Sequence, residues 1–504
     1  MQTLDLIIIF GYLIGVTLFG MWFAQKQETT EDYFVGDRSV PWWAIAASIV
    51  ATETSTITFI SVPGIAFAKG GNFQFLQLVF GYMLGRVVIS LLFIPMYFRG
   101  ELQTVYQLLG TRFGTKVKML ASALFVVMRN IADGIRLLLT AIVLAAVYVA
   151  FQPNADTNLV IIGSIVLLGA VMIIFTYYGG MEAVIWVEVV QLGIYIGGAI
   201  AAAVVILNQI DGGMPSVLSI GQQFDKFDLF DFTLDFTKTF TFWAGLIGGC
   251  FLTMSTHGTD QYLVQRYLCT NKPSRAALAL LSSGAVVLGQ FIGFLFIGVL
   301  LFTFYAPYNA TEYANAGVLN SGIPATFPFA GGDQVFPNFI TQKMPSGLSG
   351  LVVAAIFAAA LSSSLNSIAA TFVNDLYKPF RQNLADKHYL KVSHWLTLFF
   401  GIVQIVVAIA AMKQNSSALS QALSIASLIN GPILGVFLVG AFVKRANQKA
   451  ALIGMSASIL LMTYVILATK IAWTWYALIG SLVTLLVAWL ASLVFNNQKQ
   501  ENAK

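Results

Sequence analysis

Long apolar runs, separated by polar loops, constrain this chain more than any other feature. A helix needs about 20 apolar residues to cross the hydrocarbon core of a bilayer, and about thirteen runs fit that length. They lie at 3–25, 41–68, 73–98, 119–150, 159–178, 184–208, 241–264, 276–305, 346–375, 391–413, 419–443, 450–469 and 473–495. Only 10% of the residues are charged and 58% are hydrophobic, which is unlike a soluble domain. The sequence therefore predicts an all-α polytopic membrane protein.

The charges of the loops predict how these spans are oriented. About eighteen of the 27 Lys and Arg residues lie in every second loop, for example in RGELQTVYQLLGTRFGTKVK (99–118) and KPFRQNLADKHYLK (378–391). Short loops rich in Lys and Arg remain in the cytoplasm. This rule places the N-terminus outside and the C-terminus inside, which requires an odd number of spans, and thirteen meets that requirement.

The sequence shows no motif of nucleotide-binding proteins, metalloproteins or enzymes. The chain has no GxxxxGK[ST] phosphate loop, and its three His and two Cys residues show no metal-ligand or disulfide spacing. We find no catalytic constellation and no appended soluble domain. We therefore expect no enzyme activity, no organic cofactor and no nucleic-acid partner. The expected partners are the lipid bilayer, a small-molecule solute and a coupling ion, for a monomer or weak oligomer in the inner (plasma) membrane.

Polar segments interrupt four of the predicted spans. They are ATETSTITF (51–59), YYGGMEAVIWVEVVQ (177–191), AAALSSSLNS (358–367) and SLINGPILGVF (427–437). Non-helical backbone at membrane depth is tolerated only where it is buried in protein or lines a cavity, and buried carboxylates such as Glu53 and Glu188 are costly. Broken helices in both halves of a chain predict a transporter built from inverted repeats, with its site near the membrane midplane.

Each polar segment also has a purely structural interpretation. Hydroxyl groups and small residues join packed membrane helices, and a proline kinks a helix without forming a site. Glu188 can pair with a buried base such as Arg129 or Arg136. The carboxylate of Glu53 is what favours a binding site at the first segment.

Five segments, in the same order and over nearly the whole chain, resemble motifs of the sodium:solute symporter family. They are EDYFVGDRSVPWWAIAASIVATETSTITFISVPG, YYGGMEAVIWVEVVQ, GTDQYLVQRYL, AAIFAAALSSSLNSIAATFVNDLYKP and GPILGVFLVGAF. The resemblance implies a LeuT-type fold with two inverted five-helix repeats. An extra N-terminal helix and loop would occupy 1–40, the first repeat 41–208, the second repeat 209–445, and two extra helices with the tail 446–504.

The resemblance implies a sodium site between the first and eighth core helices. The positions assigned to ions are Ala51, Thr54, Ile356, Ala359, Ala360, Ser363 and Glu188. Ala359 and Ala360 replace the family's paired hydroxyl ligands, although Ser363 lies one turn away. Sodium requires oxygen ligands, so three alternatives are open. Glu53 replaces the lost ligands, Glu53 and Glu188 carry a proton instead, or the carrier is uncoupled.

The resemblance also implies which residues contact the solute, namely Glu53, Ser55, Thr58, Gln77, Asp260 and Asn430. Glu53, Gln77 and Asp260 would give the site an excess of hydrogen-bond acceptors, which favours a sugar or polyol. A sialic acid or another organic acid is the alternative, and its carboxylate would need Arg129 or Arg136. The predicted function is uptake of a small polar solute by alternating access, with sodium as coupling ion and a proton as the alternative.

Overall fold

The computed structural model describes residues 2–22, 27–100, 102–152, 154–305, 332–360, 364–413 and 428–501. Within these ranges every named element is a helix, and one isolated β-bridge joins Ser39 and Thr270. The helices are α1 (Thr3–Trp22), α2 (Thr30–Val35), η2 (Gly36–Arg38), α3 (Trp42–Glu53), α4 (Thr56–Phe67), α5 (Leu76–Leu92), α6 (Ile94–Tyr97), α7 (Tyr106–Phe113), α8 (Thr115–Phe151), α9 (Thr157–Asn208), α10 (Gly213–Gln223), η3 (Ala244–Gly248), α11 (Gly249–Gly258), α12 (Gln261–Leu268), α13 (Pro273–Tyr305), α15 (Gly332–Gln342), α16 (Leu348–Ala360), α17 (Leu365–Thr371), η4 (Phe372–Tyr377), α18 (Asp386–Ala411), α20 (Asn430–Phe442), α21 (Gln448–Ala468), η5 (Trp473–Trp475) and α22 (Tyr476–Glu501).

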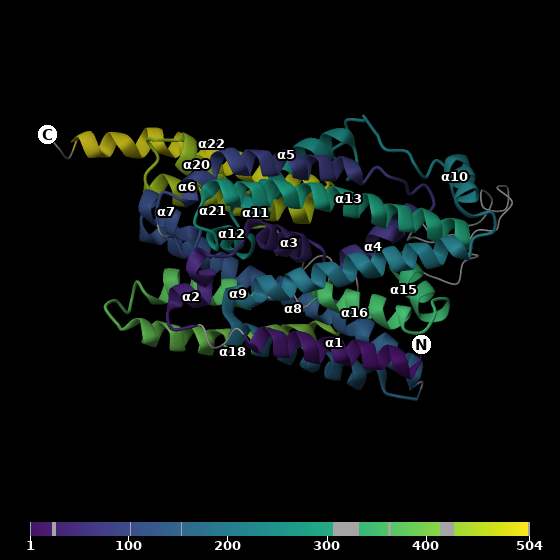
Figure 1. The fold of residues 1–504 in the computed structure, drawn as a ribbon. Coiled ribbons are helices and arrows are strands. Elements are labelled where there is room, and N and C mark those ends of the chain that lie inside the picture. The colour runs from purple at the N-terminus through teal and green to yellow at the C-terminus, as the bar shows by residue number, and fades with distance from the viewer. Residues whose placement is uncertain are drawn as a thin grey trace.

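The helices form an elongated bundle in which most of the long elements run along one direction (Figure 1). Helix α1 begins at the end of the bundle where α10 and α15 lie, and α22 ends at the opposite end. Eight helices in the described ranges are long and apolar enough to cross a membrane, and nine if α3 and α4 form one bent span. The all-α class is confirmed, whereas the number thirteen and the side that each terminus faces stay predictions.

Helix α9 joins two of the predicted spans. Its 52 residues cover 159–178 and 184–208, with a break at Gly180, whose φ is 59°. A Cβ at this position would lie 2.8 Å from the carbonyl oxygen of Tyr33, and residues with a side chain rarely adopt this backbone conformation. The chain therefore bends at Gly180, between the two spans that the sequence predicts.

Small residues bring α5 against η3 and α11. A Cβ on Gly81 would collide with the Gly245 carbonyl, and one on Gly85 would lie 2.7 Å from the Thr253 side chain. Membrane helices associate through such small residues because the backbones can then approach closely. This contact places Arg86 of α5 beside His257 of α11, and both residues belong to the site described next.

Candidate functional site

The first polar segment is a break between two helices whose axes differ by 60°. Helix α3 ends at Glu53, and Thr54 and Ser55 have extended ψ values of 92° and 163°. The Ser55 hydroxyl accepts a hydrogen bond from the Thr58 amide at 3.2 Å and so caps α4. Serine is a favoured N-cap because its oxygen satisfies an amide that has no helical partner. The broken helix predicted from this segment is therefore present.

The break also changes the bonding of the backbone carbonyls. The Ser55 amide donates to the Glu53 carbonyl at 3.1 Å, whereas an uninterrupted α-helix would direct it to the carbonyl of Ala51. The hydroxyl oxygen of Thr54 accepts hydrogen bonds from the Tyr195 hydroxyl at 3.0 Å and the Gln290 amide at 2.6 Å. The Ala51 carbonyl, which the family resemblance assigns to an ion, thus loses its helical donor.

Glu53 lies against two basic side chains. Its Oε2 is ion-paired with Arg86, and its Oε1 lies 2.9 Å from Nε2 of His257. The Arg86 side chain is completely buried, and 14% of the Glu53 side chain is exposed. A buried charge is tolerated when it is paired, so Arg86 neutralises the carboxylate that interrupts the first core helix.

A cavity of about 400 Å³ opens beside Glu53. Its charged and hydroxyl-bearing lining residues are Thr52, Glu53, Thr58, Ser61, Tyr82, Arg129, Arg136, Thr253, Thr256, His257, Asp260 and Tyr262. Apolar walls come from Phe75, Phe291 and four aliphatic residues. Concave sites with apolar walls and a few convergent polar groups are typical of small-molecule binding. The lining includes Glu53, Thr58 and Asp260 of the predicted solute contacts.

Two arginines of α8 lie in the cavity wall. Arg129 contacts Asp133 at 2.8 Å and Asp260 at 3.7 Å, and its guanidinium lies 3.7 Å from the centre of the Tyr262 ring. Arg136 contacts Asp133 at 3.7 Å. The exposed fraction is 12% for the Arg129 side chain and 44% for that of Arg136. Arg136 is therefore the more accessible of the two cations.

Glu188 belongs to a separate buried cluster. It is ion-paired with Arg266 of α12 at 2.6 Å and accepts hydrogen bonds from Ser48 and Thr52 of α3. Only 1% of Glu188 is exposed. The pairing with a buried base that the sequence offers as the structural interpretation is thus observed, with Arg266 rather than Arg129 or Arg136 as the base.

Gln77 lies beneath the segment that connects α10 to η3. Its amide nitrogen donates to the carbonyls of Gln74 and Phe240, and its oxygen accepts from the Asp231 amide at 3.0 Å. The residue is 1% exposed and does not line the cavity. Its hydrogen-bonding groups are occupied by protein, so its assignment to the solute stays a prediction without geometric support.

The remaining predicted ion and solute positions do not line the cavity, or their side chains lie outside the described residues. Ala51 and Ile356 are each 1% exposed, and Asn430 begins α20 outside the cavity lining. The backbones of Ala359 and Ala360 belong to α16, while Ser363 lies outside the described residues. These ion and solute assignments stay predictions.

Sequence reasoning missed Arg86 and His257 as neighbours of Glu53. Arg86 lies within the apolar run LGRVVISLLF, and a base inside a predicted span is rare and needs a partner. That signal could have paired it with Glu53. His257 carries no comparable signal, because nothing in its local sequence indicates that α11 turns it toward α3.

Comparison with known proteins gives consistent matches over most of the chain. A model of the sodium:solute symporter family matches residues 33–458. A sodium/sialic acid symporter of Aliivibrio fischeri is 33% identical, covering 98% of this chain and 94% of its own. A sodium/sialic acid symporter of Proteus mirabilis is 30% identical, covering 98% and 95%.

A solved structure of a sodium-coupled sialic acid symporter, bound to substrate and open to the outside, has the same fold. Its TM-score is 0.84 at 29% identity, and the match covers 98% of both chains. The chain therefore has the fold of the LeuT-type transporters, as the sequence predicts.

Proposed function

This chain belongs to the sodium:solute symporter family, and we propose that the solute it carries with sodium is an acidic sugar of the sialic acid class. Family membership makes it a sodium-coupled solute symporter and a multi-pass protein of the inner membrane, not an enzyme. Two relatives that are at least 30% identical over nearly the whole chain are named as sialic acid symporters. That likeness supports the choice of solute.

The observation that carries this proposal is the accessible guanidinium of Arg136 in the cavity wall. Its contact with Asp133 is long, at 3.7 Å, and 44% of its side chain is exposed. Asp133 already receives the shorter contact from Arg129. A guanidinium binds a carboxylate through two parallel hydrogen bonds, so Arg136 is suited to hold the carboxylate of an acidic solute.

The pairing of the cavity acids weakens the case for a neutral sugar or polyol. That case needs free acceptors at Glu53, Gln77 and Asp260. Glu53 is paired with Arg86, Asp260 contacts Arg129, and Gln77 bonds to the protein backbone. The hydroxyls of Thr58, Ser61 and Thr256 in the lining suit the hydroxyl groups of a sialic acid equally well.

We further propose that sodium is bound mainly by backbone carbonyls at the break. The carbonyl of Ala51, which lacks its helical donor, supports this arrangement. Oxygen ligands of this kind suit a hard cation. Glu53 is a poor replacement for the missing hydroxyls of Ala359 and Ala360, because Arg86 and His257 already occupy both of its oxygens.

Uptake into proteoliposomes tests the proposed solute. We expect labelled N-acetylneuraminic acid to accumulate when an inward sodium gradient is imposed, and glucose and inositol to accumulate far less. Each solute is also tested with a proton gradient alone and with no gradient. Sodium-driven uptake of a neutral sugar, without uptake of the acid, would reject the acidic solute and restore the sugar or polyol.

A further inference from the structure

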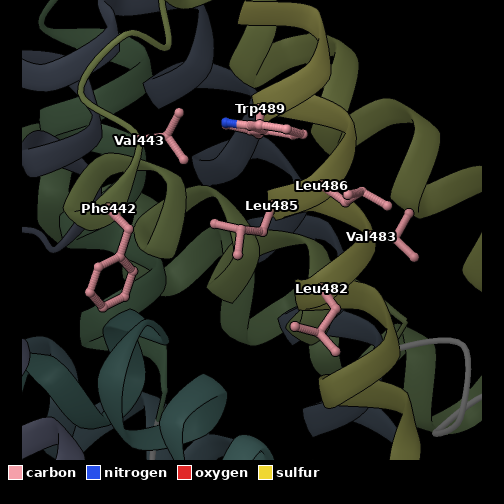
Figure 2. A pocket seen from close by; sticks show the side chains of 7 residues that line it. All are labelled: Phe442, Val443, Leu482, Val483, Leu485, Leu486 and Trp489. Atoms are coloured by element: carbon pink, nitrogen blue, oxygen red, sulfur yellow. The ribbon is translucent and has the colours of Figure 1, made fainter.

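An apolar groove lies between the end of α20 and the second half of α22. Figure 2 shows Phe442 and Val443 on one side of it and Leu482, Leu485 and Trp489 along α22 on the other. The groove has a volume of about 430 Å³ and, in contrast to the solute cavity, its lining includes no charged side chain among the described residues. It is therefore a separate feature from the site of transport.

The groove opens to the outside of the bundle. Phe442 is 63% exposed and Trp489 is 47% exposed. Residues 473–495 form one of the spans long and apolar enough to cross a membrane. Apolar side chains exposed along such a span are covered by hydrocarbon rather than water. The chemistry of the groove therefore fits an acyl chain.

Three basic residues follow directly at the end of the groove that holds Val443. Lys444 and Arg445 are exposed and adjoin Val443 in sequence, and Lys449 is exposed at the start of α21. The ammonium of Lys449 lies 5.9 Å from the centre of the Phe495 ring, less than two turns beyond Trp489 on α22. None of the three takes part in an ion pair with another described residue.

Arg112 of α7 fixes the turn that carries these charges. Its guanidinium donates to the carbonyls of Val443 and Lys444 at 3.0 Å and of Ala446 at 3.2 Å. These bonds hold the turn between α20 and α21, in which the Val443 carbonyl also accepts a hydrogen bond from the Ala446 amide at 3.0 Å. The backbone that positions Lys444 and Arg445 beside the groove is thus held before any ligand binds.

We propose that this groove binds an anionic phospholipid, with an acyl chain along α22 and the phosphate-bearing headgroup against Lys444, Arg445 and Lys449. Charge complementarity selects this occupant, because basic clusters beside membrane helices attract anionic headgroups. A zwitterionic lipid would fill the same groove but would gain little from the three cations. The site adds a lipid partner to the solute and the ion.

Quenching of Trp489 by brominated lipids tests the proposal, since bromine quenches an indole that it touches. The protein is reconstituted in phosphatidylcholine containing 10% brominated phosphatidylglycerol, or 10% brominated phosphatidylcholine. The contribution of Trp489 is the part of the quenching that is absent in Trp489→Phe. We expect the Trp489-dependent quenching by brominated phosphatidylglycerol to be about five times that expected from its mole fraction alone.

The basic residues are tested by the triple variant Lys444→Gln/Arg445→Gln/Lys449→Gln. It should reduce the quenching by phosphatidylglycerol to that by phosphatidylcholine. The control Arg381→Gln/Lys387→Gln/Lys391→Gln removes the same charge from exposed positions elsewhere and should leave the preference unchanged. Equal quenching by both lipids in the wild type would overturn the proposal. So would a Trp489 that neither lipid quenches, because another protein molecule would then cover the groove.

Discussion

Arg86 of α5 and Glu53 of α3 form an ion pair at the point where the first core helix breaks. The guanidinium is fully buried, and its Nε also lies 3.5 Å from the hydroxyl of Ser283 on α13. Glu53, whose carboxylate the sequence suggests as a free ligand, is therefore neutralised by Arg86 of a neighbouring helix. Arg136, with 44% of its side chain exposed, is the cation to which the proposed function assigns the recognition of an acidic solute.

Removing one member of the Arg86–Glu53 pair should destabilise the protein strongly. Glu53→Gln and Arg86→Met each leave a buried charge without its partner, which costs about 3–5 kcal/mol. The double variant removes both charges and should lose clearly less than the sum of the two single losses. Unfolding of the purified proteins in detergent measures the three values. Strictly additive losses would show that the two side chains do not interact.

Gln77→Leu should reduce stability without changing solute recognition. Its amide joins α5 to the segment at Asp231 and Phe240, so the variant loses hydrogen bonds between protein groups. Leaving buried groups unpaired costs about 1–3 kcal/mol. Thermal unfolding and the KM of uptake are measured together. A raised KM at unchanged stability would return Gln77 to the solute site.

Lys226, in the segment after α10, predicts a pH dependence of stability. Its Nζ lies within hydrogen-bonding distance of the carbonyls of Ala66, Phe67 and Ala68 at the end of α4, and the residue is 1% exposed. Burial lowers the pKa of Lys226 to about 7, whereas the pKa in an unfolded chain is about 10.4. Between these values the unfolded chain binds the proton and the folded chain does not. Stability should therefore rise with pH in this window.

The variant Lys226→Met has no titrating group at this position and should lose that rise. Its melting temperature and that of the wild type are compared from pH 6 to pH 9. The melting temperature of the wild type should rise relative to that of Lys226→Met as the pH increases. Parallel pH profiles of the two proteins would mean that Lys226 keeps its ordinary pKa.

Restoring hydroxyls at the assigned ion positions should strengthen sodium binding. Ala359→Ser/Ala360→Ser adds two oxygen ligands at the two positions that the family resemblance assigns to the sodium site. We expect the sodium concentration for half-maximal uptake to fall about tenfold. Ala358→Ser adds a hydroxyl one residue away and serves as the control. An unchanged sodium dependence would place the ion elsewhere.

The sequence predicts much of the fold because the signals are local. Runs of apolar residues locate the membrane helices, and the hydroxyl cluster around Glu53 locates the break at Thr54 and Ser55. Such patterns depend only on neighbouring residues. The thirteen spans follow from the same reasoning, whereas the bounds of the two inverted repeats follow from the family resemblance, and both remain predictions.

The partners of the buried charges could not be predicted in the same way. Glu188 pairs with Arg266, which lies 78 positions further along the chain, and Glu53 pairs with Arg86 across a contact between two helices. Helical periodicity identifies a face of a helix but not the helix that covers it. Gln77 illustrates the same limit, because its side chain turns toward the Asp231 segment instead of the cavity.

Discrimination between N-acetylneuraminic acid and its methyl ester shows whether the cavity recognises a carboxylate through Arg136. The two compounds differ only in the charge and capping of the carboxyl group, so a difference in binding reports its recognition. Binding to the purified protein in sodium is measured for the wild type, Arg136→Gln and Arg136→Lys. We predict that the wild type prefers the acid by about tenfold or more, that Arg136→Lys keeps part of this preference, and that Arg136→Gln loses it. An equal affinity of the wild type for the acid and the ester would show that the cavity does not recognise a carboxylate and would reject the proposed role of Arg136.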